Sequence, residues 1–153
     1  MSTSDRIVVT GIGLVTPIGI GIEENWRNLM EGRSGIDTIT RFDPSNLSTR
    51  FAGEVKNFDA TDYMDRKEVR HYDRFLHFAV AASDLALQDA GLNKDSLPSD
   101  RTGVLVGSGM GGMETFVENT LALENRGPRR VSPFFVPAII GNMASGLLTI
   151  RYG

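Results

Sequence analysis

The chain of 153 residues contains no cysteine and only two histidines. The absence of a thiol excludes disulfide bonds, thiolate metal ligands and a cysteine nucleophile within these residues. The two histidines, His71 and His77, would point to different faces of a helix at this spacing and make a poor metal pair. The sequence therefore predicts no metal site and no cofactor.

A basic excess is also missing, since the formal net charge is -3 and the isoelectric point is about 5.4. This balance argues against a chain built as a whole to bind nucleic acid. One apolar stretch, residues 131–150, carries no charge and is formally long enough to span a membrane. Because proline, glycine, serine and asparagine interrupt it, we expect a buried helix of a large soluble protein and no membrane partner.

Short apolar runs alternate with helical patterns along the chain. Residues 6–10 and 102–106 are apolar runs followed by glycine and predict buried strands, and a further short strand is expected at 51–55. Apolar residues at helical spacing predict four helices, at 22–31, 73–90, 113–126 and 137–152. The first carries an apolar stripe of Ile22, Trp26, Leu29 and Met30. Strands that alternate with helices indicate an α/β fold with at least some parallel sheet.

A glycine-rich segment, GSGMGG at residues 107–112, lies between a predicted strand and a predicted helix. It matches the G-x-G-x-x-G pattern in which a dinucleotide pyrophosphate meets a helix N-terminus. That pattern also needs an acidic residue about 20 positions further on, where this chain has arginines instead. A glycine turn that lets another backbone or an extended ligand approach closely is the commoner explanation, and nucleotide binding stays open as an alternative.

Two basic clusters stand out in this acidic chain. The first consists of Arg66, Lys67, Arg70 and Arg74 at helical spacing, and the second of Arg129 and Arg130. A solvated helix face is one explanation of such a cluster. If the clusters bind a partner, they would suit a compact acidic partner better than a long polyanion.

Two adjacent aromatic residues, Phe134 and Phe135, lie between Pro133 and Pro137. The prolines stiffen the backbone and hold both rings in fixed directions. Core packing, the wall of an apolar ligand tunnel and a subunit interface all fit this pattern.

Several phrases, in order and with compatible spacing, resemble one family over essentially the whole chain. They are VVTGIGLVTPIG at 8–19, TRFAGEV at 49–55, GSGMGG at 107–112, and GPRRVSPFFVP, NMASG and TIRYG within 127–153. They resemble the elongating β-ketoacyl-acyl carrier protein synthases, most closely the synthase II type of bacterial fatty acid synthesis.

The resemblance implies a thiolase-like fold, layered α/β/α/β/α, with two pseudo-equivalent α/β halves in one chain. It also implies a cytoplasmic homodimer. We therefore expect residues 1–153 to form an incomplete N-terminal thiolase-like domain of mixed sheet and helices, which ends just before the catalytic cysteine of the family.

The resemblance also implies the chemistry. The family transfers an acyl chain from the phosphopantetheine of acyl carrier protein to a cysteine. It then decarboxylates malonyl-acyl carrier protein and condenses the carbanion with the acyl group to give a 3-oxoacyl product. The family's cysteine, histidines and lysine lie beyond TIRYG, so we expect no catalytic residue in this chain, and neither His71 nor His77 is one of them.

Matching motif by motif gives two groups of expected site residues. The acyl pocket and dimer interface would be formed with Gly109, Met110, Phe134 and Phe135, of which Met110 stands at the pocket mouth and Phe135 reaches toward the partner subunit. The acidic carrier protein would dock on Lys67, Arg70, Arg129 and Arg130.

These expectations describe a segment of a condensing enzyme that is inactive alone. Two alternatives remain from the sequence. One is a self-standing thiolase-like module that binds carrier protein or an acyl chain without catalysis, and the other is a nucleotide-binding α/β domain that uses Gly107 to Gly112.

Overall fold

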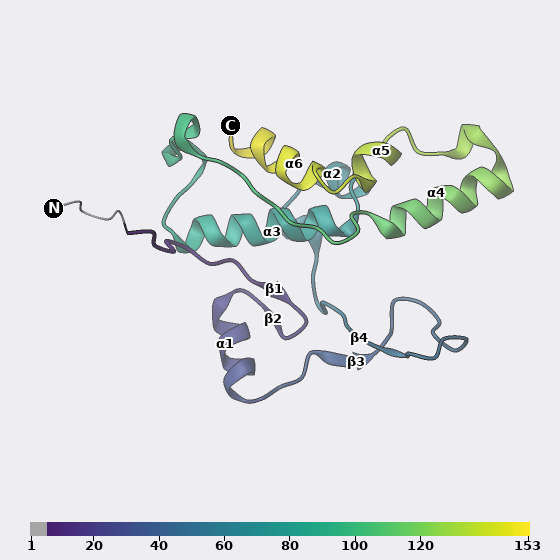
Figure 1. Cartoon of the computed structure of the whole chain (residues 1–153), viewed down its shortest axis with the longest axis horizontal. Helices are drawn as coiled ribbons and strands as arrows, with labels where there is room; N and C mark the ends of the chain where they lie inside the picture. The colour runs from purple at the N-terminus through teal and green to yellow at the C-terminus, as the bar shows by residue number, and fades with distance from the viewer. Residues whose placement is uncertain (1–5) are drawn as a thin grey trace.

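The computed structural model describes residues 6–153, and the expected domain of 1–153 therefore includes five residues outside the described part. Figure 1 shows two layers: helices α2 to α6 above, and α1 with two hairpins below. The lower layer contains β1 (Val15–Thr16), β2 (Gly19–Ile20), α1 (Ile22–Met30), β3 (Ile36–Thr38) and β4 (Phe51–Gly53). The upper layer contains α2 (Arg66–His71), α3 (Arg74–Asp89), α4 (Met113–Arg126), α5 (Phe135–Ile139) and α6 (Met143–Tyr152). Short 3-10 turns lie at Ala60–Asp62, Lys94–Ser96, Ser99–Arg101 and Pro128–Arg130.

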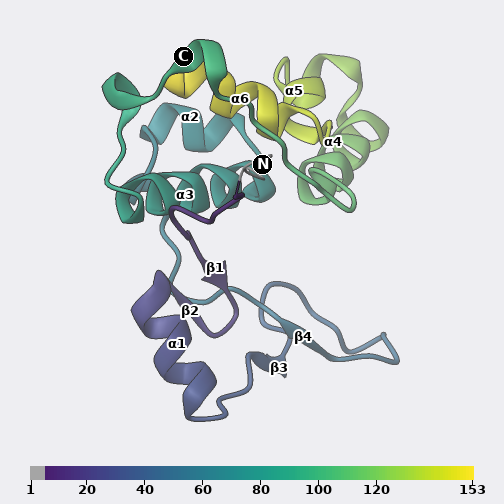
Figure 2. The ribbon, with the colours of Figure 1, turned by 60° about the vertical axis from the view of Figure 1, so that its left-hand side comes forward.

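Helix α3 carries the core. Leu76 and Val80, one helical turn apart, are completely buried. They pack with Met64, Ala144, Leu147 and Leu148, so that α6 lies along α3 (Figure 2). The helix ends before Gly91, which has a left-handed φ of 66°. The predicted helix at 73–90 is thereby confirmed.

Glycine allows the N-terminal segment to lie directly on α3. A β-carbon added at Gly13 would lie 1.9 Å from the carbonyl oxygen of Ala82, and one at Gly11 would lie 2.3 Å from that of Ala86. Only glycine permits so close a backbone approach. The small residues of both segments therefore set the distance between the extended chain and the helix.

The strands form two antiparallel hairpins. Val15 pairs with Ile20 in the first, and Asp37 pairs with Ala52 in the second, where the strand predicted at 51–55 is found at Phe51–Gly53. Residues 6–10 and 102–106 form no strand, and Ile7 and Leu105 are 100% and 96% exposed.

The prediction of buried strands at 6–10 and 102–106, and with it of a parallel pair, is therefore wrong for the described residues. An apolar run predicts burial, but a strand forms only where a neighbour completes its hydrogen bonds, and residues 6–153 supply none for these two segments.

Helix α1 buries its polar side. Asn25 and Asn28 are buried, and their amide groups donate to carbonyl oxygens in and beside the β1–β2 hairpin. Trp26, Leu29 and Met30 of the apolar stripe are exposed instead. The helix is confirmed at Ile22–Met30, but its apolar stripe faces outward.

The last predicted helix is two helices. After α5 the backbone becomes extended at Ile140, and α6 starts at Met143. The prediction of one continuous helix at 137–152 is therefore wrong, because the extended Ile140 interrupts the hydrogen-bond ladder between the two helices. Within residues 6–153, no helix is both long and apolar enough to cross a membrane.

Candidate functional site

The glycine loop at residues 107–112 is pressed against α5. The amide of Gly112 donates to the carbonyl of Ile139 at 3.1 Å. A β-carbon added at Gly111, whose φ is 68°, would lie 2.2 Å from the same oxygen, and one added at Gly112 would lie 2.3 Å from the oxygen of Ala138. These two glycines thus allow the backbone of the loop to lie directly against the backbone of α5. Since α5 occupies this side of the loop, the geometry does not favour the nucleotide alternative.

The loop holds Met110 outward. Met110 is 73% exposed, and its own side chain is not held by burial. The loop backbone is held on both sides of it, because the amide of Gly111 donates to the hydroxyl of Ser108 at 3.0 Å. No neighbouring atom lies within 4 Å of a β-carbon added at Gly109, so the space beside that residue is open.

The two aromatic residues diverge to different helices. Phe134 stacks on His71 of α2, with ring centroids 3.7 Å apart and planes inclined by 14°. Phe135 lies against Phe116 of α4, with centroids 6.0 Å apart. Phe134 is 40% exposed and Phe135 is partly buried. The prolines and the start of α5 therefore direct one ring to each neighbouring helix.

The His71–Phe134 stack joins the end of α2 to the start of α5, and the two groups of basic residues lie on the segments that lead to these ends. Lys67 and Arg70 lie on α2, the helix that ends at His71, and both are exposed. Arg129 and Arg130 are also exposed and lie in the 3-10 turn a few residues before Phe134. This turn is fixed to α4, because Asn119 accepts a hydrogen bond from the amide of Ser132 at 2.7 Å. The stack thus connects α2 to the start of α5, while the turn that carries Arg129 and Arg130 lies at the C-terminal end of α4, away from α2 (Figure 1).

A small polar cleft of about 280 Å³ is lined in part by Arg70. Its charged lining consists of three cations and three carboxylates, namely Arg41, Arg70, Arg74, Asp73, Glu114 and Glu118. Arg41 and Glu114 form an ion pair at 2.6 Å that connects the loop after β3 to α4. Arg74 donates to the carbonyl of Val55 at 3.0 Å and lies over the ring of Phe78. The charges in the cleft are therefore mixed, with no excess of one sign.

His77 is a structural residue. Its Nε2 lies 3.1 Å from the carbonyl oxygen of Val69, between α3 and α2. Burial lowers the pKa of His77, because the charged form loses solvation, although the nearby carbonyls and Asp73 act in the opposite direction. The described part of the chain contains no group of three or more histidine, cysteine or acidic residues able to hold a metal ion.

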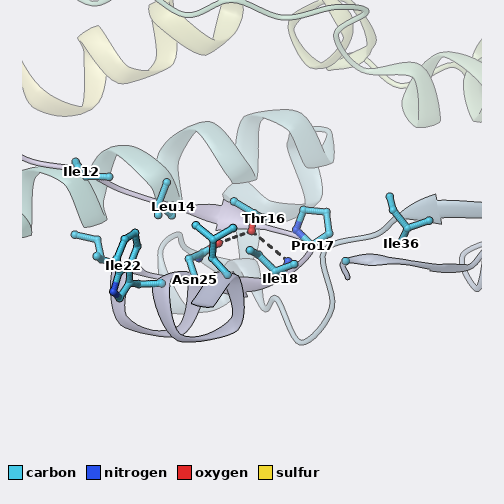
Figure 3. Close-up of a pocket in the computed structure, with 11 residues that line it drawn as sticks. Ile12, Leu14, Thr16, Pro17, Ile18, Ile22, Asn25 and Ile36 are labelled. Carbon is cyan, nitrogen blue, oxygen red and sulfur yellow. Dashed lines mark hydrogen bonds between the residues drawn. The ribbon is translucent and has the colours of Figure 1, made fainter. Parts of the chain in front are cut away.

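The sequence did not predict the apolar groove that Figure 3 shows. It has a volume of about 510 Å³ between α1, the β1–β2 turn and Ile36, and it is lined mainly by apolar side chains such as Leu14, Ile18 and Trp26. At its polar edge the hydroxyl of Thr16 donates to the amide oxygen of Asn25 at 2.5 Å. The exposed stripe of α1 was the signal for this groove, and none of the expected site residues lines it.

The arrangement as a whole offers a binding surface rather than a reacting group. The chain has no cysteine, and neither histidine is positioned as a base for a nucleophile: one is stacked on Phe134 and the other contacts a backbone carbonyl. What these residues can supply is a fixed glycine loop, two directed aromatic rings and exposed cationic side chains on two segments.

Comparison with known proteins shows which family the chain is similar to. The family described as "Beta-ketoacyl synthase, N-terminal domain" matches residues 4–153. A 3-oxoacyl-(acyl-carrier-protein) synthase 2 of Synechocystis is 52% identical over 97% of this chain and 36% of the relative. One of Staphylococcus aureus is 47% identical over the whole chain and 37% of the relative.

A solved structure agrees with the sequence comparison. The crystal structure of a β-ketoacyl synthase from Burkholderia phymatum superposes with a TM-score of 0.80 at 30% identity, over 97% of this chain and 37% of that one. The expectation of part of a thiolase-like fold is confirmed by this likeness. The chain spans little more than a third of the length of the relatives it matches.

Proposed function

The chain belongs to the β-ketoacyl synthase family, and we propose on that basis that it is the N-terminal segment of a 3-oxoacyl-acyl carrier protein synthase of type II. The complete enzyme would condense an acyl chain with malonyl-acyl carrier protein during fatty acid elongation, releasing carbon dioxide. The identity of about half of all aligned residues with two synthases of that name is the observation that carries this proposal.

The domain boundary is part of the proposal. Residues 1–153 would form an incomplete N-terminal thiolase-like domain, and the cysteine, the histidines and the lysine of the family would lie beyond it. The cysteine-free composition agrees with this division, because covalent acyl transfer needs a thiolate that this segment lacks.

The segment would contribute the docking surface for acyl carrier protein. Lys67, Arg70, Arg129 and Arg130 are exposed, so all four side chains are accessible to a partner. A positive patch of this kind attracts an acidic partner and steers its approach. The acyl or malonyl phosphopantetheine of that partner would then enter near the glycine loop.

Gly109, Met110, Phe134 and Phe135 would line the acyl pocket and the dimer interface of the complete enzyme. The fixed loop around Met110 and the exposed apolar side chains of Phe134 and Val136 support this assignment. The proposed cytoplasmic location rests on the family resemblance alone.

A non-catalytic thiolase-like module that binds carrier protein or an acyl chain is the second candidate, and it too is compatible with a segment that has no cysteine. The two candidates differ in what the complete protein does. With an acyl-carrier protein and malonyl-carrier protein as substrates, the condensing enzyme forms a 3-oxoacyl product and one carbon dioxide per condensation. A complete protein that binds carrier protein but forms neither product would establish the second candidate.

A further inference from the structure

One buried carboxylate connects the glycine loop at 107–112 to two helices. Asp73 is only 6% exposed and stands between α2 and α3. Its Oδ2 accepts a hydrogen bond from the amide of Thr115, in the first turn of α4, at 2.8 Å. Its Oδ1 accepts from the amide of Phe75, in the first turn of α3, at 3.4 Å. The first turns of two helices thus meet at one carboxylate.

The same side chain lies against the loop backbone. A β-carbon added at Gly112 would lie 2.9 Å from Cβ and 3.0 Å from Cγ of Asp73. On its other side the same β-carbon would meet the carbonyl oxygen of Ala138 at 2.3 Å. Gly112 is therefore held between Asp73 and α5, with space for no side chain of its own.

These contacts fix the residue that the loop presents. Because Met110 is exposed, its place depends on its backbone, which is held at Gly111 by Ser108, at Gly112 by Ile139 and at the start of α4 by Asp73. Asp73 is the charged member of this set. Loss of its carboxylate would free the first turn of α4 and, through Gly112, the loop before it.

We propose that Asp73 is a positioning residue for acyl-chain selection, which acts by fixing the loop that presents Met110 at the pocket mouth. The inference rests on the proposed function, since it assigns Met110 to an acyl pocket. It goes beyond that function by placing the control of chain-length preference in a carboxylate outside the pocket. If Asp73 only capped α3, its loss would loosen α3 and leave the glycine loop in place.

Asp73→Ala and Asp73→Asn in the complete protein test the inference. Amide hydrogen exchange over residues 107–116 reports the loop, and kcat/KM with short and long acyl-carrier substrates reports selection. Asn93→Ala is the matched control, since the Asn93 side chain also accepts from two backbone amides, those of Asp95 and Ser96, in a surface turn.

In Asp73→Ala we expect exchange at Thr115 and in residues 107–112 to accelerate about tenfold, the effect of losing a helix cap. The ratio of kcat/KM between long and short substrates should fall toward one. Asp73→Asn, which keeps one acceptor oxygen, should give intermediate changes in both measurements. Asn93→Ala should change neither the loop exchange nor the ratio.

Three results would overturn the inference. They are unchanged exchange over 107–116 in Asp73→Ala, an acceleration that is equal throughout α3, α4 and α6, and a mobile loop with an unaltered chain-length profile. A wild-type protein that forms no 3-oxoacyl product would refute the proposed function and the selection role together. The exchange at Thr115 would then still decide whether Asp73 holds the loop.

Discussion

At the scale of single residues, the glycines fall into two groups. Some lack a side chain because another backbone lies close by, and others have open space beside them. Gly13 and Gly111 lie where a β-carbon would collide with a backbone oxygen, so their neighbours cannot move aside as a flexible side chain could. No atom lies within 4 Å of a β-carbon added at Gly103, and the φ of that residue is not left-handed. Close backbone packing therefore requires glycine at Gly13 and Gly111, but not at Gly103.

Gly13→Ala should destabilise the protein by about 1 to 3 kcal/mol, because the added methyl group must push the N-terminal segment away from α3. Denaturant unfolding of the complete protein measures the change. Gly103→Ala is the control and should remain within about 0.5 kcal/mol of the wild type. Equal losses in both variants would show that the contact between Gly13 and Ala82 is not the cause.

His77 should titrate below its ordinary pKa of 6.5, because burial disfavours the imidazolium. A lowered pKa in the folded state means that the unfolded chain binds the proton more readily. The contribution of the neutral His77 ring to the free energy of unfolding is thus present above pH 6.5, and it is lost as the pH falls through the pKa of the folded state. Titration of the ring resonances by NMR, assigned with His77→Gln, checks this. A midpoint at or above 6.5 would contradict the burial of this ring.

At the scale of elements, one polar cluster joins α6 to α3. Arg151 donates to Asp84 at 3.1 Å and to the carbonyl of Tyr63 at 2.7 Å. The hydroxyl of Tyr152 donates to the other oxygen of Asp84 at 2.5 Å. Burial, assisted by the Asp84 carboxylate, raises the pKa of Tyr152 far above its ordinary value. The TIRYG phrase is therefore fixed to α3 by polar contacts as well as by the apolar core.

Asp84→Ala should lower the free energy of unfolding by about 1 to 3 kcal/mol, because two partly buried donors lose their acceptor. The Asp84 and Arg151 side chains are each 30% exposed. Glu31→Ala removes an exposed ion pair with Arg33 and serves as the control, with little expected effect. Equal effects in the two variants would place the Asp84 cluster among ordinary surface contacts.

The same elements show what can be predicted from sequence. Helices α3 and α4 were predictable because helical periodicity and a glycine just after the last turn are local signals. The state of residues 6–10 and 102–106 was not, since a strand depends on distant partners. The His71–Phe134 contact joins residues far apart in the chain, so spacing alone could not reveal it.

At the scale of the whole molecule, the described residues leave much apolar surface uncovered. Val9, Leu105 and Trp26 are 80%, 96% and 62% exposed, and two extended segments have unpaired backbone groups. Such surfaces promote association between chains. The compact part of the chain, around α3 and α6, is small by comparison.

The 153-residue chain alone should therefore be poorly soluble or oligomeric and should form no 3-oxoacyl product. Light scattering with size-exclusion chromatography measures the first property, and a carbon dioxide release assay measures the second. A monodisperse monomer with a cooperative melting transition would instead favour the self-standing binding module. Release of carbon dioxide from the purified chain would refute the assignment of all catalytic residues to other parts of the protein.

Charge reversal in the two groups of basic residues tests the proposed docking of acyl carrier protein on this segment. In the complete protein, Lys67→Glu with Arg129→Glu should raise KM for acyl-carrier substrates roughly two- to tenfold and weaken the salt dependence of binding, because exposed pairs are individually weak and act as a cluster. Activity with small acyl-CoA analogues should remain unchanged, as it should for both substrates in the control Lys94→Glu with Arg101→Glu. An equal loss with both substrate types, or no loss with either, would contradict the docking assignment.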